Sequence, residues 1–201
     1  MANIPGQDLI TRCLDEYDTF LLEADTPINS REDNIGFIWT FSLHLQGTNS
    51  VIKWQILCED DGEYTTWESV EQRYQKQIYW NGHVQIGVAI LRTFKPQHRE
   101  QTLNWIRGAM STCFLGLKAK YTRRKEPLPA FPFLYWAPGV INTLQNLNVI
   151  KLDAPVQQLR PWTDSILRWL ENARTKNPAL MQGLPVWDIR SKDQHTLRDS
   201  N

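Results

Sequence analysis

The chain has 201 residues, of which 41% are hydrophobic, so it is long enough to form one ordinary domain with a real core. Its 22 basic and 22 acidic residues cancel. The molecule as a whole therefore does not attract nucleic acid by net charge, and any such site must be local.

The pattern of apolar residues predicts neither a targeting signal nor a membrane span. No run approaches the ~20 apolar residues of a membrane span, and the N-terminus lacks the apolar core of a signal peptide. The three cysteines, Cys13, Cys58 and Cys113, follow no zinc or disulfide spacing. We therefore expect a soluble, intracellular protein that does not bind membranes.

The N-terminal part of the chain is expected to contain a helix and two strands. Apolar residues recur at three- and four-residue steps over residues 4–22, which predicts a helix. The polar stretch 26–34 predicts a loop. Residues 35–45 and 51–58 are rich in β-branched and aromatic side chains and predict two strands.

Two helices and two strands are expected in the middle of the chain. Residues 66–76 follow a threonine that can cap a helix and carry acidic residues in the first turn, so we predict a helix. An Asn-Gly turn precedes a strand over 83–91. Residues 96–110 open with a proline and keep apolar residues on one face, which predicts the clearest helix. Residues 112–117 are expected to form a short strand.

The C-terminal part combines basic, proline-rich and helical segments. Residues 118–125, KAKYTRRK, place five basic residues around one tyrosine. The prolines of residues 127–139 predict an extended segment across apolar surface, because proline disrupts helices. Residues 162–173 predict an amphipathic helix, and residues 191–201 predict a disordered tail.

Together these elements predict an α+β fold, with an antiparallel β-sheet and flanking helices. The core domain is expected over residues 35–152. Residues 1–34 are expected to form a helical arm and loop, and residues 153–201 a C-terminal helix and irregular tail.

One strand carries a candidate metal pair. His83 and Gln85 alternate with apolar residues, so their side chains share one face of the predicted strand. An imidazole and an amide oxygen held side by side are able to bind a divalent metal. A solvated polar strand face is the alternative reading. His44 lies near the end of the strand predicted over residues 35–45. One interpretation of its side chain is a buried and hydrogen-bonded imidazole.

Three short motifs occur in order along the chain. Residues 39–44 read WTFSLH, residues 83–85 read HVQ, and residues 121–125 read YTRRK. This order is similar to that of the HUH-type Rep endonucleases, the rolling-circle replication initiators of small circular single-stranded DNA viruses. The second motif matches fully. In the third the lysine stands one position late, and residues 54–59, WQILCE, compete for the first.

The resemblance implies a nucleophile and its charged neighbours. Tyr121 would attack a phosphodiester of single-stranded DNA and form a covalent phosphotyrosine, which allows nicking and joining. Lys125, or Arg124 at the family's lysine position, would stabilise the ionised tyrosine and hold phosphate. The residues expected to bind the nucleic-acid backbone are Lys118, Lys120, Arg123 and Arg124.

The resemblance also implies a Mg²⁺ or Mn²⁺ cofactor. His83, Gln85 and Glu59 would hold the ion, which would polarise a phosphoryl oxygen. Glu59 is chosen because it ends a neighbouring predicted strand, and the acidic residues close after it are alternatives: Asp60, Asp61 and Glu63.

Two other functions fit the same residues. A non-catalytic viral accessory protein would bind DNA or RNA through the basic run and aromatic stacking, in the host nucleus or cytoplasm. A protein-interaction module would dock a partner through the aromatic and proline-rich segment 128–139. No Walker pattern occurs, which excludes an ATP-driven replicase in this chain.

Overall fold

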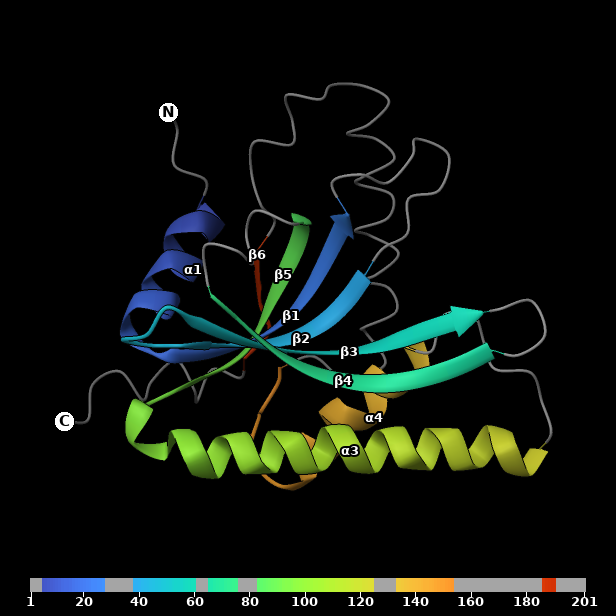
Figure 1. Ribbon diagram of the computed structural model, residues 1–201. Coiled ribbons are helices and arrows are strands. Elements are labelled where there is room, and N and C mark those ends of the chain that lie inside the picture. The colour runs from blue at the N-terminus through green and yellow to red at the C-terminus, as the bar shows by residue number, and fades with distance from the viewer. Residues whose placement is uncertain are drawn as a thin grey trace.

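The computed structural model describes residues 5–27, 38–60, 65–75, 83–124, 133–153 and 186–190. The predicted α+β architecture is confirmed, with helices flanking a largely antiparallel sheet (Figure 1). The elements in chain order are α1 (Pro5–Glu16), β1 (Asp18–Pro27), β2 (Ile38–Leu45), β3 (Ser50–Asp60), β4 (Thr65–Gln75), β5 (His83–Phe94), a 3-10 turn (Pro96–His98), α3 (Arg99–Arg124), α4 (Phe133–Asn146) and β6 (Val186–Asp188).

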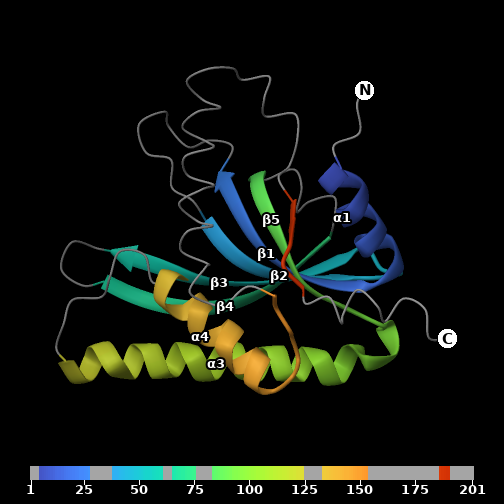
Figure 2. The same ribbon diagram turned by 180° about the vertical axis from the view of Figure 1, so that it is seen from behind.

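The sheet has six described strands in the order β4-β3-β2-β1-β5-β6. β1 to β5 pair antiparallel with their neighbours, and β6 runs parallel to β5. Figure 1 shows that β1 and β5 rise steeply while β3 and β4 sweep sideways, so the sheet is strongly twisted. α3 runs along beneath it, and Figure 2 shows α4 on the same side, against α3.

The predicted N-terminal helix is correct for α1 and wrong for residues 18–22, which begin β1. β1 lies in the middle of the sheet, between β2 and β5. Phe20 and Leu22 face one core cluster, and Leu21 faces another. A strand that is buried on both faces reads as a continuous apolar run, which periodicity alone does not separate from a helix.

β4 corrects the helix predicted over residues 66–76. It pairs with β3 along its whole length of 11 residues. Most of its described side chains are polar or charged and exposed, as is common for a strand at the edge of a sheet. Pairing with a long neighbour overrides the local helical signals of a capping threonine and first-turn acids.

α3 is longer than predicted and absorbs the expected strand over residues 112–117, which is wrong. Glycines and threonines lower its helix propensity, but Ile106, Met110 and Leu117 line one face and are buried in the core. The extended segment predicted over residues 127–139 is also wrong in its described part, because α4 begins at Phe133 and contains Pro138.

Tertiary packing explains why α4 tolerates an internal proline. Trp136, which is 1% exposed, donates a hydrogen bond from Nε1 to the carbonyl of Met110 at 3.1 Å. Its ring lies edge-on to Phe41, with centroids 5.6 Å apart. These contacts offset the backbone hydrogen bond that Pro138 removes.

The core has two parts, one on each face of the sheet. The larger lies between the sheet, α3 and α4, and its aromatic centre includes Phe20, Phe41 and Trp54. The smaller lies under α1, where Ile10 and Cys13 join side chains of β1 and β5. No helix within the described ranges is long and apolar enough to cross a membrane.

A buried carboxylate joins three elements, an arrangement that we call the Asp18 clamp. Asp18 is 1% exposed and begins β1. Arg99 donates to both of its oxygens at 2.8 Å, and the backbone N–H of Gln46 donates to Oδ1 at 2.7 Å. Arg99 also donates to the Gln46 carbonyl at 2.7 Å. The clamp therefore ties the start of α3 to β1 and to the turn after β2.

A second polar contact ties α3 to the far edge of the sheet. Glu71 of β4 accepts hydrogen bonds from the guanidinium of Arg107 and, at 2.9 Å, from Nε1 of Trp54. The bond from Arg107 lowers the pKa of Glu71 below its usual value, against the opposing effect of burial. The carboxylate is thus favoured in its charged form in the folded protein.

Replacement of Asp18 by Asn should destabilise the fold by about 2–3 kcal/mol, because an amide removes the buried charge and turns one acceptor into a donor facing Arg99. Urea denaturation measures the free energy of unfolding. The matched control is Asp15→Asn on the exposed side of α1, expected to change it by less than about 0.5 kcal/mol. An equal effect of the two substitutions would contradict the role of the clamp.

The Glu71 contact predicts a pH dependence of stability. A folded-state pKa below the usual value contributes stability that is fully present above the usual carboxyl pKa and is lost as the pH falls through the lowered value. Glu71→Gln should therefore cost about 0.5–1.5 kcal/mol at neutral pH, and the difference from the native protein should shrink in acid. Urea denaturation across pH measures this, with Glu68→Gln on the same strand as the control.

Candidate functional site

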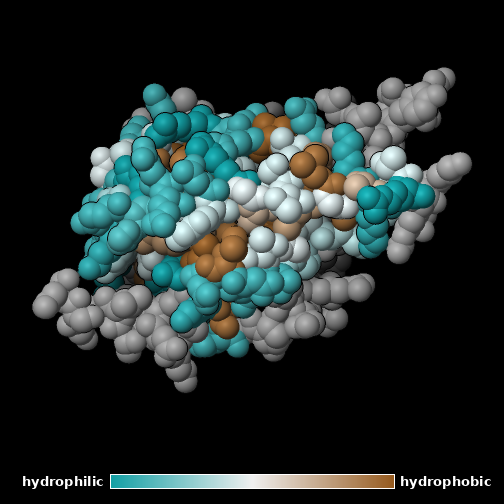
Figure 3. Space-filling view, turned by 90° about the horizontal axis from the view of Figure 1, so that it is seen from below, coloured by the Kyte–Doolittle hydropathy of each residue, from teal (hydrophilic) through white to brown (hydrophobic). Residues whose placement is uncertain are grey.

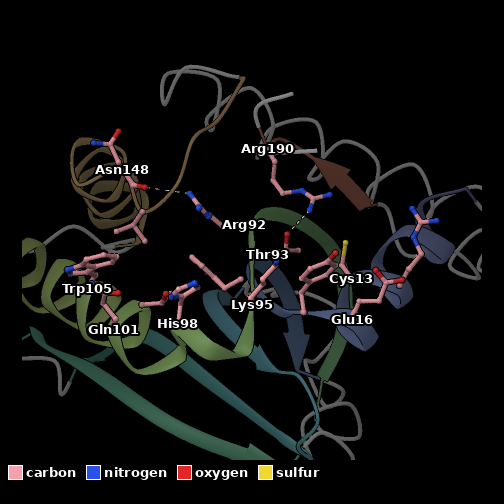
Figure 4. Close-up of a pocket in the computed structure, with 15 residues that line it drawn as sticks. Cys13, Glu16, Arg92, Thr93, Lys95, His98, Gln101, Trp105, Asn148 and Arg190 are labelled. Carbon is pink, nitrogen blue, oxygen red and sulfur yellow. Dashed lines mark hydrogen bonds between the residues drawn. The ribbon is translucent and has the colours of Figure 1, made fainter. Parts of the chain in front are cut away.

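A pocket of about 420 Å³ lies where α1, the end of β5 and the start of α3 meet (Figure 4). Figure 4 shows α1 residues on one side, α3 residues on the other, and the end of β5 between them. The turn after α4 and the residues after β6 complete the lining. The lining residues are Arg12, Cys13, Glu16, Tyr17, Arg92, Thr93, Phe94, Lys95, His98, Gln101, Thr102, Trp105, Asn148, Val149 and Arg190.

The lining carries more positive than negative charge. Its four Arg and Lys residues come from three segments that are far apart in the chain, and its acidic residue is Glu16. Arg12 and Lys95 are exposed to solvent, whereas Arg190 is 4% exposed. Such a lining favours an anionic ligand, because guanidinium groups form strong charge-assisted hydrogen bonds with phosphate and carboxylate.

Arg190 is a fixed part of the wall. Its Nε donates to Asp188 Oδ1 at 2.8 Å, and one terminal nitrogen donates to Thr93 Oγ1 at 3.1 Å. Burial acts to lower the pKa of Arg190, but the bonds to Asp188 outweigh it and raise the pKa. Arg190 therefore stays charged, in a position that these bonds fix before any ligand arrives.

Arg92 is half-buried beside it. Its guanidinium lies 5.3 Å from the centroid of the Phe94 ring and donates a long bond of 3.5 Å to the carbonyl of Asn148. Burial lowers the pKa of Arg92, which means that the loss of water disfavours its positive charge. An anion bound beside Arg92 would offset this loss.

Aromatic side chains flank the cationic groups. Trp105 projects from α3 with 42% of its surface exposed, and Tyr17 comes from the end of α1 on the other side. An indole of this size that stays exposed beside a pocket offers a flat apolar face, suited to stacking against a ring of a ligand. The pocket thus combines cationic side chains with an exposed aromatic face.

The predicted metal ligands lie on two separate strands. His83 and Gln85 are in β5, where they pair with Pro27 and Asp25 of β1. Glu59 is in β3, and β2 and β1 lie between β3 and β5. The side chains of these three residues, and the alternatives Asp61 and Glu63, lie outside the part of the chain that can be described, as does the side chain of Asp60. Within the described part no group of three His, Cys, Asp or Glu side chains suits a metal. The metal site stays a prediction.

The predicted nucleophile is part of the core. Tyr121 lies near the C-terminal end of α3, is 9% exposed and packs edge-on to Tyr135, with ring centroids 6.4 Å apart. His83 begins β5 at the upper end of this strand, whereas α3 runs along the bottom (Figures 1 and 2). The structure does not bring these two residues together.

The predicted nucleic-acid-binding residues lie at the C-terminal end of α3 and just after it. Lys118, Lys120 and Arg123 are exposed on the last turns of α3, and the ammonium of Lys120 lies 5.7 Å from the Tyr121 ring centroid. The side chain of Arg124 and all of Lys125 fall outside the described residues. At 1.5 Å per residue, Lys120 lies about 22 Å along the helix from Trp105 in the pocket.

The other face of the sheet carries a polar cluster that the sequence analysis did not predict. Glu23, Thr40, Ser42 and His44 are each 0% exposed, and Lys53 is 3% exposed. His44 Nε2 and Glu23 Oε1 lie 3.1 Å apart, which confirms the reading of His44 as a buried, hydrogen-bonded imidazole. Among the described residues, three oxygens of this cluster have no hydrogen-bond partner: Glu23 Oε2, Thr40 Oγ1 and Ser42 Oγ.

Sequence reasoning also missed the pocket, because its residues come from five segments and no single segment is unusual. The one local signal is at the end of β5, where Arg92 and Lys95 flank an aromatic residue just before a helix begins. A fold alone does not specify a function, so the site must carry the argument. Comparison of the chain with protein-family models, with curated proteins and with solved structures gives no match.

Proposed function

We propose that this protein binds single-stranded nucleic acid, with phosphate and base held in the pocket between α1, β5 and α3. The observation that carries the proposal is that four Arg and Lys residues and the exposed Trp105 line one pocket of about 420 Å³. Proteins that bind single strands combine a positively charged surface for the backbone with aromatic faces for the bases.

The basic end of α3 supports a longer contact. Lys118, Lys120 and Arg123 are exposed on the helix that also forms one wall of the pocket. In the view from below, hydrophilic residues gather toward both ends of this side of the molecule, with pale and hydrophobic residues between (Figure 3). A strand held in the pocket and laid along α3 would therefore meet cationic side chains at both ends.

DNA and RNA are both expected ligands. Phosphate contacts and base stacking are available to either, since neither interaction uses the 2′ position of the sugar. The net charge of zero also fits a local contact, because a strand would meet positive charge at the pocket and at the end of α3 rather than over the whole molecule.

Rep-like nicking and joining of single-stranded DNA is a second proposal, supported by the resemblance and by the placement of His83 and Gln85 on one strand, β5. It requires Tyr121, now 9% exposed, to reach a phosphodiester, and a Mg²⁺ or Mn²⁺ held at the predicted ligands. Docking of a protein partner through residues 128–139 has less support, because the Trp136 side chain of that segment is buried.

Two pocket variants should weaken strand binding in different ways. Lys95→Gln removes a phosphate contact, so the slope of log affinity against log salt should become shallower by about 0.7. Trp105→Ala should lower affinity by about 1–3 kcal/mol without changing that slope, because stacking releases no counterions. Fluorescence anisotropy with a labelled single strand over a salt series measures both.

The matched control for these variants is Arg73→Gln, which removes one positive charge from the exposed face of β4, at the opposite edge of the sheet. It should leave affinity and slope unchanged. The proposal is wrong if the native protein binds neither DNA nor RNA strands, or if the control weakens binding as much as Lys95→Gln does.

Nicking predicts a covalent product. In Mn²⁺, a nucleophilic Tyr121 would leave a protein–DNA adduct that survives denaturing electrophoresis, whereas simple binding leaves none. Tyr121→Phe keeps the buried ring and removes the attacking oxygen, and His83→Ala removes a predicted metal ligand, so both should abolish the adduct. Strand binding without any adduct, tested over many sequences, would exclude nicking and leave the binding proposal intact.

A further inference from the structure

We infer that two copies of this chain pair with each other through the outer face of α3, with the two helices antiparallel. The inference goes beyond the proposed binding of strands and does not depend on it. Three observations carry it: an uncharged line of exposed residues along α3, an exposed leucine that matches an open space beside a glycine, and opposite charges at the two ends of one side of the helix.

The outer face of α3 carries no charge along its middle line. Ile106, Met110 and Leu117 are buried and mark the inner face of the helix. The residues opposite them recur in steps of three and four, and all of them are exposed: Gln101, Asn104, Gly108, Ser111, Leu115, Ala119 and Thr122. A helix face that meets only water normally carries charged side chains. An uncharged line over about six turns is instead typical of a helix that packs against another helix.

Leu115 is the most exposed large hydrophobic residue that the structure describes, with 61% of its surface accessible. Seven residues earlier on the same line, Gly108 leaves an open space, because a Cβ there would have no neighbour within 4 Å. The fold of one chain therefore does not need glycine at this place, although glycine costs a helix about 1 kcal/mol relative to alanine. An exposed leucine and an open space of this kind suit close contact between two helices.

Twofold symmetry brings these two residues together. Gly108 and Leu115 lie equally far from the midpoint between Ser111 and Thr112. In an antiparallel pair with its twofold axis at that midpoint, Leu115 of each copy lies level with Gly108 of the other. The contact is thus made twice, as a self-complementary interface between two identical chains requires. A parallel pair would instead set Leu115 against Leu115 and Gly108 against Gly108.

Charge selects the same direction. Glu100 and Lys118 are both exposed, and they are about five full turns apart, so they lie on the same side of the uncharged line. An antiparallel pair places Glu100 of each copy toward Lys118 of the other, whereas a parallel pair places each beside its own like charge. Exposed ion pairs contribute ~0–1 kcal/mol each, so these charges set the direction of pairing more than its strength.

The pocket stays accessible beside this interface. Trp105 lines the pocket and lies about 80° round the helix from Leu115. Arg123 lies about five turns beyond Trp105 on the same side of α3. A strand held in the pocket would therefore run along this side of the helix, and the uncharged line would remain free for the second copy.

The test is the mass of the full chain in solution, measured by sedimentation equilibrium over micromolar concentrations. The native protein should approach the mass of two chains as its concentration rises. Leu115→Gln should keep the mass of one chain because it removes the apolar contact, and Gly108→Gln should do so because the glutamine fills the place of the other copy's leucine. Thermal unfolding should show that both variants fold, since Leu115 is exposed and the space beside Gly108 is open.

The matched control is Gly116→Gln, the same substitution one residue after Leu115. The space beside Gly116 is equally open, but this residue lies about 100° round the helix from Leu115 and off the uncharged line. This variant should dimerise as the native protein does. A dimer that is retained in Gly108→Gln, or lost equally in Gly116→Gln, would overturn the proposed contact.

The direction of pairing has its own test. Glu100→Lys should weaken the dimer about tenfold, because it sets positive charges against each other at both ends of the pair. Adding Lys118→Glu to the same chain should restore the native dissociation constant, since each ion pair is then reversed, and failure to restore it would overturn the antiparallel arrangement. A native protein that stays monomeric at every concentration would overturn the inference as a whole. Strand binding, which is measured separately by anisotropy, would be unaffected by that result.

Discussion

The pairing of Asp18 with Arg99 is the contact on which the arrangement of this protein depends. Asp18 begins β1 shortly after α1, whereas Arg99 begins α3 after the 3-10 turn that follows β5. A single bidentate ion pair therefore holds two chain connections that are 81 residues apart in sequence. The pocket lies between the same two connections, since Tyr17 precedes one partner and His98 precedes the other. The clamp thus joins two of the chain connections that lie beside the pocket.

The elements that could be predicted from the sequence are those whose local pattern agrees with their environment. β2, β3 and β5 alternate or run apolar between turn signals, and the helix after Pro96 keeps one apolar face. The elements that were predicted wrongly have physical reasons for the difference. β1 is covered on both faces and so loses its alternation, and β4 depends on its eleven-residue pairing with β3 rather than on its own propensity. α4 survives Pro138 through packing that no local rule contains.

The candidate sites also differ in how much of each could be predicted from the sequence. Motif comparison selects residues that are close in sequence or that follow the motif order of a family, such as His83 with Gln85, and it places these two correctly on one strand. A motif does not show how deeply a side chain is buried, so it does not predict that Tyr121 lies within the core cluster. The pocket is the opposite case, because its cations lie on α1, at the end of β5 and after β6, and become neighbours only in the folded chain. Sequence alone could not show that arrangement, since each cation is ordinary in its own segment.

The buried polar face of the sheet has a consequence for the evolution of this chain. Thr40 and Ser42 bury hydroxyl oxygens that have no hydrogen-bond partner within the described part of the chain, and a buried hydroxyl left unpaired costs about 1–3 kcal/mol relative to solvent. Apolar side chains of similar shape would avoid that cost, so these two positions are far from the choice that maximises stability. Single substitutions at the centre of β2 are therefore expected to raise the melting temperature of the protein. A heat-adapted descendant of this protein would be expected to change there first.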